Sequence, residues 1–250
     1  DSLVSTDQLT AIVFEDQVEW GRMTGQWMVD TLGGSGKILA INGPAGIAVS
    51  EQRWQGAKEI FDANTGIEIV GTANIEYNEA PALPEMESLL SAHPDVNGIW
   101  CQAGAHASAA LKTLQSLGMD LIPITGENFN AFLKAWCELV DSGSDFQAFG
   151  TAEANYMAVI SLNLAILAKQ GQEVPSVVEV PLPKTPMSAH GPIRICQTTG
   201  TRSPRYRDRP RSSRSSPMRC LPVRRQSRQP RLGSRLTPAP LPEGRGVLLP

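Results

Sequence analysis

Short apolar runs alternate with stretches of helical periodicity between residues 11 and 169. The runs are Ala11–Phe14, Lys37–Asn42, Ile67–Ala73, Gly98–Cys101, Leu121–Thr125 and Gln147–Thr151. Runs of this length predict buried strands. Strict alternation of strand and helix predicts right-handed crossovers and a parallel sheet with helices on both faces. Ligand sites of such α/β folds lie at the carboxyl ends of the strands.

Between the runs, apolar residues recur on one helical face, as in Trp20, Met23 and Trp27. The stretch Met157–Leu167 is almost wholly apolar. We interpret it as a buried helix, because it is shorter than the roughly 20 residues that span a bilayer. We therefore expect no membrane span in the chain, and no signal peptide is visible at its start.

Charge divides the chain near residue 190. Residues 1–190 contain 8 Lys and Arg against 23 Asp and Glu, a formal charge of −15, whereas residues 191–250 contain 14 Arg and 2 acids, a charge of +12. The second part also holds 10 of the 19 prolines. This composition predicts disorder. An arginine-rich nucleic-acid arm is one interpretation, but we favour a G+C-rich gene translated out of frame and expect no nucleic-acid partner.

Most catalytic motifs can be set aside. The Gly33–Lys37 segment lacks the first Gly and the Ser or Thr of a phosphate loop, and it precedes a strand instead of following one; we interpret it as a helix end and turn. Neither Cys101 nor Cys137 has metal-ligand spacing to a histidine, and both are predicted to be small core residues. With no nucleophile–base pair in view, we expect neither an enzyme nor a bound metal or cofactor.

Polar and aromatic residues gather after the predicted strands and at nearby helix starts. They are Arg53, Trp54, Tyr77, Asn78, Gln102, Glu127, Asn128, Asn130 and Glu153. Amide and carboxylate groups can bind vicinal hydroxyls in pairs, arginine offers a fork of donors, and an aromatic face can cover the apolar side of a sugar ring. The set suits a neutral polyhydroxylated ligand. Caps and surface positions remain the alternative role for many of its members.

A collinear series of segments gives this pattern a family resemblance. The series is Asp16–Gly25, Gly43–Gly46, Arg53–Gly56, His93–Val96 and Leu111–Gly118. From about Leu9 to Leu182 the chain resembles type I periplasmic sugar-binding proteins, the ribose-binding-like solute receptors of ABC importers, and mainly their carboxyl-terminal lobe. The resemblance implies a two-lobed fold, capture of a mono- or small saccharide without catalysis, delivery to a membrane permease, and a periplasmic location.

The resemblance also implies roles for individual residues. The ligand-binding arginine of the family falls on Arg53, its ring-stacking aromatic on Tyr77, and its strand-end carboxylate on Asn128, with Glu127 beside it. A late polar contact falls near Glu153. The Asn/Asp pair expected after the fourth strand is Ala103-Gly104 here, so that contact is absent or replaced by Gln102.

The same comparison predicts the organisation of the chain. Residues 1–15 are expected to be a remnant of the amino-terminal lobe, 16–152 the carboxyl-terminal lobe, 153–190 a return helix and last strand, and 191–250 the tail. With one lobe, Arg53, Tyr77, Glu127 and Asn128 should face solvent. The effector-binding core of a LacI-like transcription regulator shares this fold and remains the alternative, although the Gly126–Asn128 junction and the acidity of residues 1–190 favour the receptor.

Overall fold

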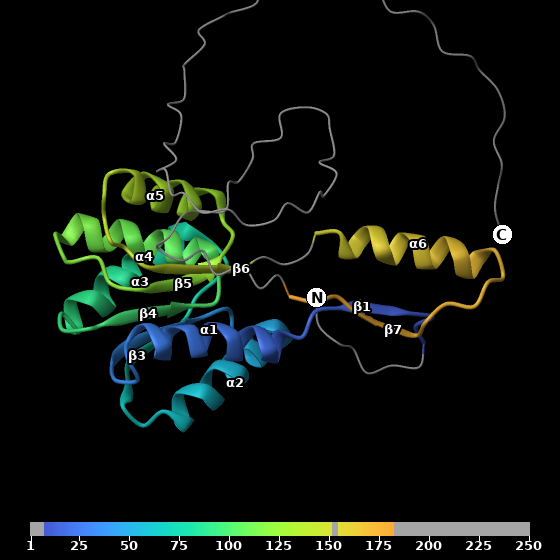
Figure 1. Cartoon of the computed structure of the whole chain (residues 1–250), viewed down its shortest axis with the longest axis horizontal. Coiled ribbons are helices and arrows are strands. Elements are labelled where there is room, and N and C mark those ends of the chain that lie inside the picture. Colours follow the sequence, from blue (N-terminus) through green and yellow to red (C-terminus); the bar gives the residue numbers. More distant parts are fainter. Residues whose placement is uncertain (1–7, 152–154, 183–250) are drawn as a thin grey trace, which may run out of the picture. The chain divides into compact units, whose positions relative to one another are not determined.

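A five-stranded parallel sheet forms the centre of the structure, a computed structural model that describes residues 8–151 and 155–182. Its strands are β2 (Gly36–Asn42), β3 (Ile67–Asn74), β4 (Gly98–Cys101), β5 (Ile124–Glu127) and β6 (Ala148–Thr151). Their spatial order is β3-β2-β4-β5-β6, and every pair is parallel (Figure 1). The chain thus adds β3 on one side of β2 and then places β4 on the other. This reversal between β2 and β4 is a topological switch point, the usual place for a ligand.

Helices cover both faces of this sheet (Figure 1). Helices α1 (Gln17–Thr31) and α2 (Ala48–Ala63) pack on the face that carries Ile38, Ala40 and Trp100. Helices α3 (Glu79–Ala92), α4 (Gly104–Leu117) and α5 (Asn130–Asp141) pack on the other face, over Leu39 and Ile41. Alternate residues of β2 therefore enter opposite cores, which explains why the strand reads as a continuous apolar run. The predicted parallel sheet flanked by helices is confirmed.

Glycines allow α1 and α2 to approach each other closely. A Cβ on Gly56 would lie 1.9 Å from the backbone oxygen of Val18, and a Cβ on Gly21 would lie 2.0 Å from that of Arg53. No other residue type fits at these two crossing points without moving a helix. The contact sets how the amino-terminal turn of α1 lies beside Arg53 of α2.

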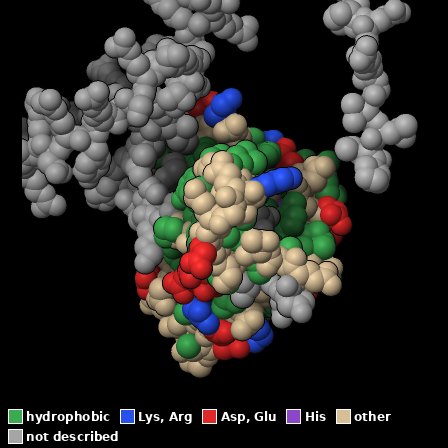
Figure 2. All heavy atoms as spheres, turned by 90° about the vertical axis from the view of Figure 1, so that its right-hand side faces the viewer, with side chains coloured by type: hydrophobic (Ala, Val, Ile, Leu, Met, Phe, Trp, Pro, Cys, Tyr) green, Lys and Arg blue, Asp and Glu red, His purple; other side chains and the backbone are tan. Residues whose placement is uncertain are grey.

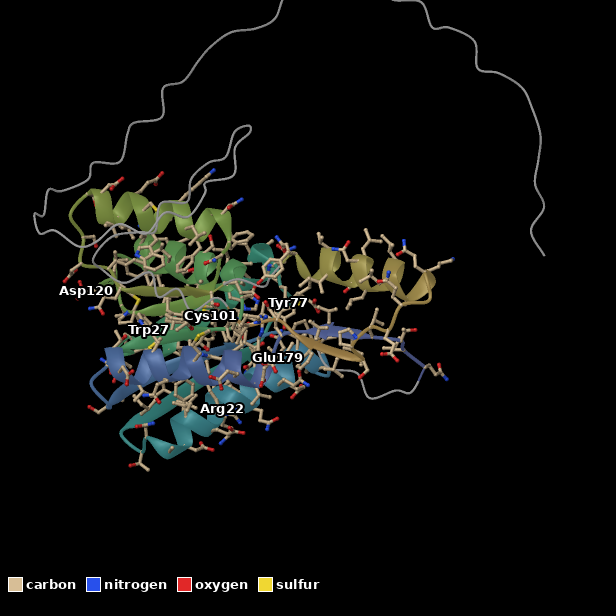
Figure 3. The ribbon with its side chains drawn as sticks, turned by 45° about the vertical axis from the view of Figure 1, so that its right-hand side comes forward. Arg22, Trp27, Tyr77, Cys101, Asp120 and Glu179 are labelled. Atoms are coloured by element: carbon tan, nitrogen blue, oxygen red, sulfur yellow. The ribbon has the colours of Figure 1, made fainter. Side chains whose placement is uncertain are left out.

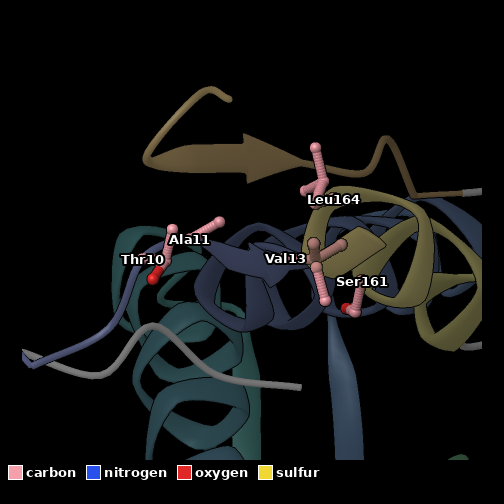
Figure 4. A pocket seen from close by; sticks show the side chains of 6 residues that line it. Thr10, Ala11, Val13, Ser161 and Leu164 are labelled. Carbon is pink, nitrogen blue, oxygen red and sulfur yellow. The ribbon is translucent and has the colours of Figure 1, made fainter. Parts of the chain in front are cut away.

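A second, smaller sheet contains β1 (Ile12–Phe14) and β7 (Val177–Glu179), which pair in parallel. Helix α6 (Met157–Lys169) packs against β1. A pocket of about 130 Å³ lies between β1 and α6, lined by Thr10, Ala11, Val13, Ser161, Leu164 and Ala165 (Figure 4). The predicted strand Ala11–Phe14 thus exists, but its partner among the described residues is β7, with no pairing to the five-stranded sheet.

Two sequence predictions were wrong in detail. The apolar stretch Met157–Leu167 is helical as predicted, but no residue of α6 is buried, and Leu162 is 61% exposed. The described element against which it packs is β1, a strand of only three residues, which is too small a surface to cover it. Hydrophobic side chains lie at the molecular surface on the side shown in Figure 2. The strand predicted at Leu121–Thr125 begins later, at Ile124, because Pro123 has no N–H to donate to a neighbouring strand. It continues to Glu127, which pairs with Thr151 of β6. The predictions for residues 191–250 lie outside the described residues.

Candidate functional site

Arg53 occupies the switch point, where it joins three elements. Its Nε donates to Oε1 of Gln17 at 2.7 Å, and its Nη1 donates to the backbone oxygen of Gln102 at 3.0 Å. The guanidinium carbon lies 4.3 Å from the ring centroid of Trp20, within cation–π range. Gln17 is in place because Asp16 caps α1, accepting from the N–H groups of Val18 and Glu19 at 2.9 Å each.

Glu127, at the end of β5, forms an ion pair with Arg53. Its Oε1 lies 2.7 Å from Nη1 of Arg53 across 74 residues of sequence. The Arg53 side chain is only 1% exposed, whereas that of Glu127 is 28% exposed. The expectation that Arg53 faces solvent was therefore wrong. Trp20, Gln17 and the β4 end enclose the guanidinium, and the carboxylate of the pair reaches the surface.

Gln102 follows β4 and is completely buried. Its Nε2 donates to Oδ1 of Asn42 at 2.8 Å and to the backbone oxygen of Ser50 at 3.0 Å, and its Oε1 accepts from the N–H of Gly43 at 3.2 Å. The side chain thus ties the end of β2 to the first turn of α2. Gln102 is one of the predicted ligand contacts. In the structure its side chain is buried and hydrogen-bonded within the fold, and its backbone oxygen accepts from Arg53.

Tyr77 follows β3 and supplies an aromatic surface that is 42% exposed. Its ring stacks on the ring of His106 with a centroid distance of 5.9 Å and an interplanar angle of 22°. A Cβ on Gly43 would lie 2.2 Å from the Tyr77 hydroxyl oxygen, so the ring depends on glycine at that position. In Figure 3, Cys101 lies inside the layers of helices and strands, and Tyr77 lies at their edge.

His106 supports this ring from the buried side. It is fully buried, and its Nε2 lies 2.9 Å from the backbone oxygen of Glu76. Burial lowers the pKa of His106 below its ordinary value, because a charged imidazolium loses its hydration there. The ring is therefore neutral at pH 7 and acts as an aromatic platform for Tyr77.

The remaining candidates divide between surface and structure. Asn128 is exposed, and its backbone N–H donates to the oxygen of Thr151. Glu153 lies outside the described residues. Asn78 caps α3, because its side-chain oxygen accepts from the N–H of Ala80. Trp54 packs on Trp100, with the two ring centroids 5.7 Å apart. Both residues therefore have structural roles. Asn130 is the exposed first residue of α5.

Sequence reasoning missed the residues that hold the site together. These are Gln17, Trp20, Asn42, Ser50, Gly43 and His106. Gln17 and Arg53 are 36 residues apart, and no local pattern links them. Only Gly43 carried a signal, since a glycine directly after a strand often marks a close approach of another group.

Within the described ranges, no cluster of three His, Cys, Asp or Glu side chains could hold a metal ion. Over the same ranges, no helix combines the length and apolar character needed to cross a membrane. Both cysteines described are reduced, and burial raises the pKa of the Cys101 thiol well above its ordinary value. The described side chains of the candidate site form hydrogen bonds, an ion pair and a stack of two rings.

The fold and the site together define a class, a parallel α/β fold with polar and aromatic side chains at the carboxyl ends of its strands. A sequence profile described as "Periplasmic binding protein domain" matches residues 1–173. The chain therefore belongs to the periplasmic binding protein family. The resemblance to type I periplasmic sugar-binding proteins is confirmed.

Curated relatives match part of this chain. The ribose import binding protein of Bacillus subtilis is 26% identical over 124 residues, covering 50% of this chain and 40% of that protein. The xylitol-binding protein of Mycolicibacterium smegmatis is 27% identical over 168 residues, covering 66% and 46%. The ribose operon repressor of Halalkalibacterium halodurans is 31% identical over 98 residues, covering 35% and 29%. The chain thus spans less than half the length of each of these relatives.

Solved structures agree on the fold. An ABC transporter periplasmic solute-binding protein from Actinobacillus succinogenes, with bound D-allose, superposes with a TM-score of 0.60 at 24% identity, covering 68% of this chain and 59% of that one. The binding protein of an arabinose ABC transporter from Shewanella gives a TM-score of 0.63 at 18% identity, covering 71% and 60%. Because both identities are below 25%, these superpositions establish the type I fold of the chain and nothing about its ligand.

Proposed function

We propose that this chain supplies the carboxyl-terminal lobe of a sugar receptor for an ABC importer and captures a mono- or small saccharide without catalysis. The Arg53–Glu127 pair, Tyr77 and Asn128 form its wall of the sugar site, and Glu153 contributes from beyond β6. Gln102 serves this wall as a buried support. Residues 8–15 with α6 and β7 belong, in this proposal, to the other lobe.

One observation carries the proposal. Arg53 of α2 and Glu127 at the end of β5 form an ion pair beside the backbone at the end of β4, at the switch point of a chain that belongs to the periplasmic binding protein family. Tyr77, which follows β3 at the same edge of the sheet, adds an exposed aromatic ring. Such groups suit the hydroxyls and the apolar face of a sugar. The names of several relatives, which include ribose, xylitol and D-allose, support the same ligand class.

The chain by itself should bind sugar weakly. Each hydrogen bond from one open wall competes with water for a net of about 0.5–1.5 kcal/mol. Immobilising the ligand costs about 4 kcal/mol or more. Small-molecule sites usually bury most of their ligand, and one wall cannot do so. We therefore expect dissociation constants no tighter than about 1 mM.

Titration of the 250-residue chain with pentoses and hexoses, followed by amide NMR shifts, tests this function. D-Ribose, D-allose, xylitol and D-glucose form the panel, at concentrations up to about 200 mM to cover the expected weak range. A sugar that binds should shift the amides of Gly43, Tyr77 and Gly126–Asn128. The absence of shifts there with every sugar would refute the site. A micromolar constant would refute the proposal that the chain carries only one wall.

A pair of tyrosine variants separates stacking from a general loss of aromatic surface. Tyr77→Ala should weaken the best sugar by about 1 kcal/mol, or roughly fivefold, because a stacked ring is lost. Tyr156→Ala removes a similarly exposed tyrosine, 52% exposed, from the start of α6 and should leave the constant unchanged. Equal effects of the two substitutions would contradict the role of Tyr77.

Delivery to a membrane permease and a periplasmic location follow from the same proposal. Relatives whose names include "import binding protein" and "periplasmic" support both. The match to a ribose operon repressor keeps an effector-binding core of a transcription regulator as the second candidate. The coding sequence upstream of Asp1 distinguishes them, since a signal peptide supports the receptor and a helix-turn-helix supports the regulator.

A further inference from the structure

We infer that two copies of this chain associate through α6, with Leu162 of each copy inserted into the pocket between β1 and α6 of the other. The partner at this surface is thus a second copy of the same chain, and the pair is a weak two-fold dimer. The inference concerns only α6, β1 and their pocket, so it does not depend on the proposed sugar site.

Helix α6 is apolar on two sides, and it packs against β1 with one of them. Ile160 and Leu164 are partly buried. On the opposite side Val159, Leu162 and Ile166 are 58%, 61% and 46% exposed. Residues three and four positions apart lie on one face of a helix, so these three side chains form a continuous apolar ridge, here called the Leu162 ridge. A helix that is apolar all round usually lies buried between partners.

The pocket lies beside the Leu162 ridge (Figure 4). Ser161 and Ala165 line it from α6, and Ala165 is a helical neighbour of Leu162 at a spacing of three. Thr10, Ser161 and Ala165 are exposed, so the pocket opens to solvent. Its volume is about 130 Å³. A cavity of roughly 150 Å³ holds a benzene ring, so the smaller side chain of a leucine fits this one.

A ridge beside a pocket makes the surface self-complementary. A two-fold rotation places the ridge of each copy against the pocket of the other, so that the same residues meet from both sides. Such a contact is closed, because each copy uses its ridge and its pocket on a single partner. The association should therefore stop at two copies.

Charge favours α6 as the place where like copies meet. Residues 1–190 contain 23 acidic and 8 basic residues, so these parts of two copies repel each other. From Met157 to Ala168, however, α6 contains no charged residue. Contact at this helix therefore removes apolar surface from water without bringing like charges of α6 together.

The size of the surface determines how strong the dimer is. A helix of 13 residues is about 20 Å long and about 10 Å wide. Its open side thus offers on the order of 400 Å² in each copy and on the order of 800 Å² in a pair. Stable complexes bury about 1,200–2,000 Å². The dimer should consequently dissociate on dilution.

Sedimentation equilibrium of the 250-residue chain tests the inference, at concentrations from about 5 to 500 µM that cover a weak association. The average mass should rise with concentration from that of one chain toward that of two. A mass that stays at one chain over the whole range would overturn the inference. Growth beyond two chains would overturn it as well, because a closed contact allows no third copy.

Two matched leucine variants test the ridge. Leu162→Glu places a charge on the ridge and should weaken the association at least tenfold. Leu83→Glu makes the same change at an exposed leucine of α3, which is 36% exposed, and should leave the association unchanged. Circular dichroism checks that both variants are folded. Equal effects of the two substitutions, or association of Leu162→Glu as in the wild type, would contradict the role of the ridge.

Ala165→Phe tests the pocket separately from general apolar attraction. The larger side chain fills the pocket from within its own copy, so the association should weaken, although the apolar surface has grown. General attraction between apolar surfaces predicts a stronger association for the same variant. Unchanged or stronger association of folded Ala165→Phe would therefore refute insertion into the pocket.

Salt separates this contact from a rival cause. Residues 191–250 carry a charge of +12 and attract the charge of −15 on residues 1–190 of another copy. About 0.5 M sodium chloride screens such attraction within a few ångströms. The apolar contact should persist in this salt or become tighter, because repulsion between the acidic parts is screened as well. Dissociation of the wild-type dimer in this salt would overturn the inference in favour of attraction by residues 191–250.

Discussion

The contact between α1 and α2 gives the sharpest stability prediction. Gly56→Ala places a Cβ 1.9 Å from the backbone oxygen of Val18, where ordinary contact begins at 3.4 Å. Helix α1 must therefore retreat by 3.4 − 1.9 = 1.5 Å, or α2 must bend. The clash is between a Cβ and a backbone oxygen, so no side-chain rotation can relieve it.

The magnitude follows from two opposed effects. Alanine is about 1 kcal/mol better than glycine inside a helix. Overpacking costs typically 1–3 kcal/mol, and more when backbone must move, so we take about 3 kcal/mol for a 1.5 Å displacement. The net loss in the free energy of unfolding should be about 2 kcal/mol. For a domain of this size that lowers Tm by about 4–8 °C.

Gly25→Ala is the matched control. It lies in the same interface, but its Cβ would meet Ala57 at 3.2–3.3 Å and Ile60 at 3.4 Å, which a small shift can absorb. Its propensity gain of about 1 kcal/mol should offset most of the cost. Urea unfolding followed by tryptophan fluorescence measures both variants. A Gly56→Ala chain as stable as Gly25→Ala would refute the argument from helix contact.

Three further outcomes follow from buried groups. Because burial lowers the pKa of His106 from its ordinary 6.5, the unfolded state takes up the proton first. The free energy of unfolding should therefore keep its full value above about pH 6.5 and decrease as the pH falls below it. His106→Gln should remove this dependence on pH in urea titrations between pH 7.5 and 5. Gln102→Leu removes the acceptor of the Gly43 N–H and the donor to the Asn42 side-chain oxygen and the Ser50 backbone oxygen, so it should cost about 3 kcal/mol or more in the same assay. In a chain carrying Cys196→Ser and Cys220→Ser, native Cys101 should resist a thiol reagent at pH 8, where burial keeps its thiol protonated, and should react only in urea; labelling of folded Cys101 would contradict its burial.

The sequence alone determined the local structure and its class. Alternating apolar runs and helical faces identified the strands and helices because period and turn residues act over a few neighbouring positions. The order of strand and helix then required a parallel sheet, since such crossovers allow little else. Those two steps also located the candidate ligand groups after the strands, as for Tyr77 and Glu127, and at nearby helix starts, as for Arg53.

Only the tertiary structure decided which groups meet and which face the solvent. Gln17 and Glu127 reach Arg53 from 36 and 74 residues away, and no periodic pattern encodes such distances. Exposure likewise depends on what lies opposite a residue. The charged Arg53 became buried because Trp20, Gln17 and Glu127 lie around it. The apolar α6 stayed exposed because β1, the described element that it packs against, has only three residues. Pattern specifies the elements, and packing between distant elements specifies the site.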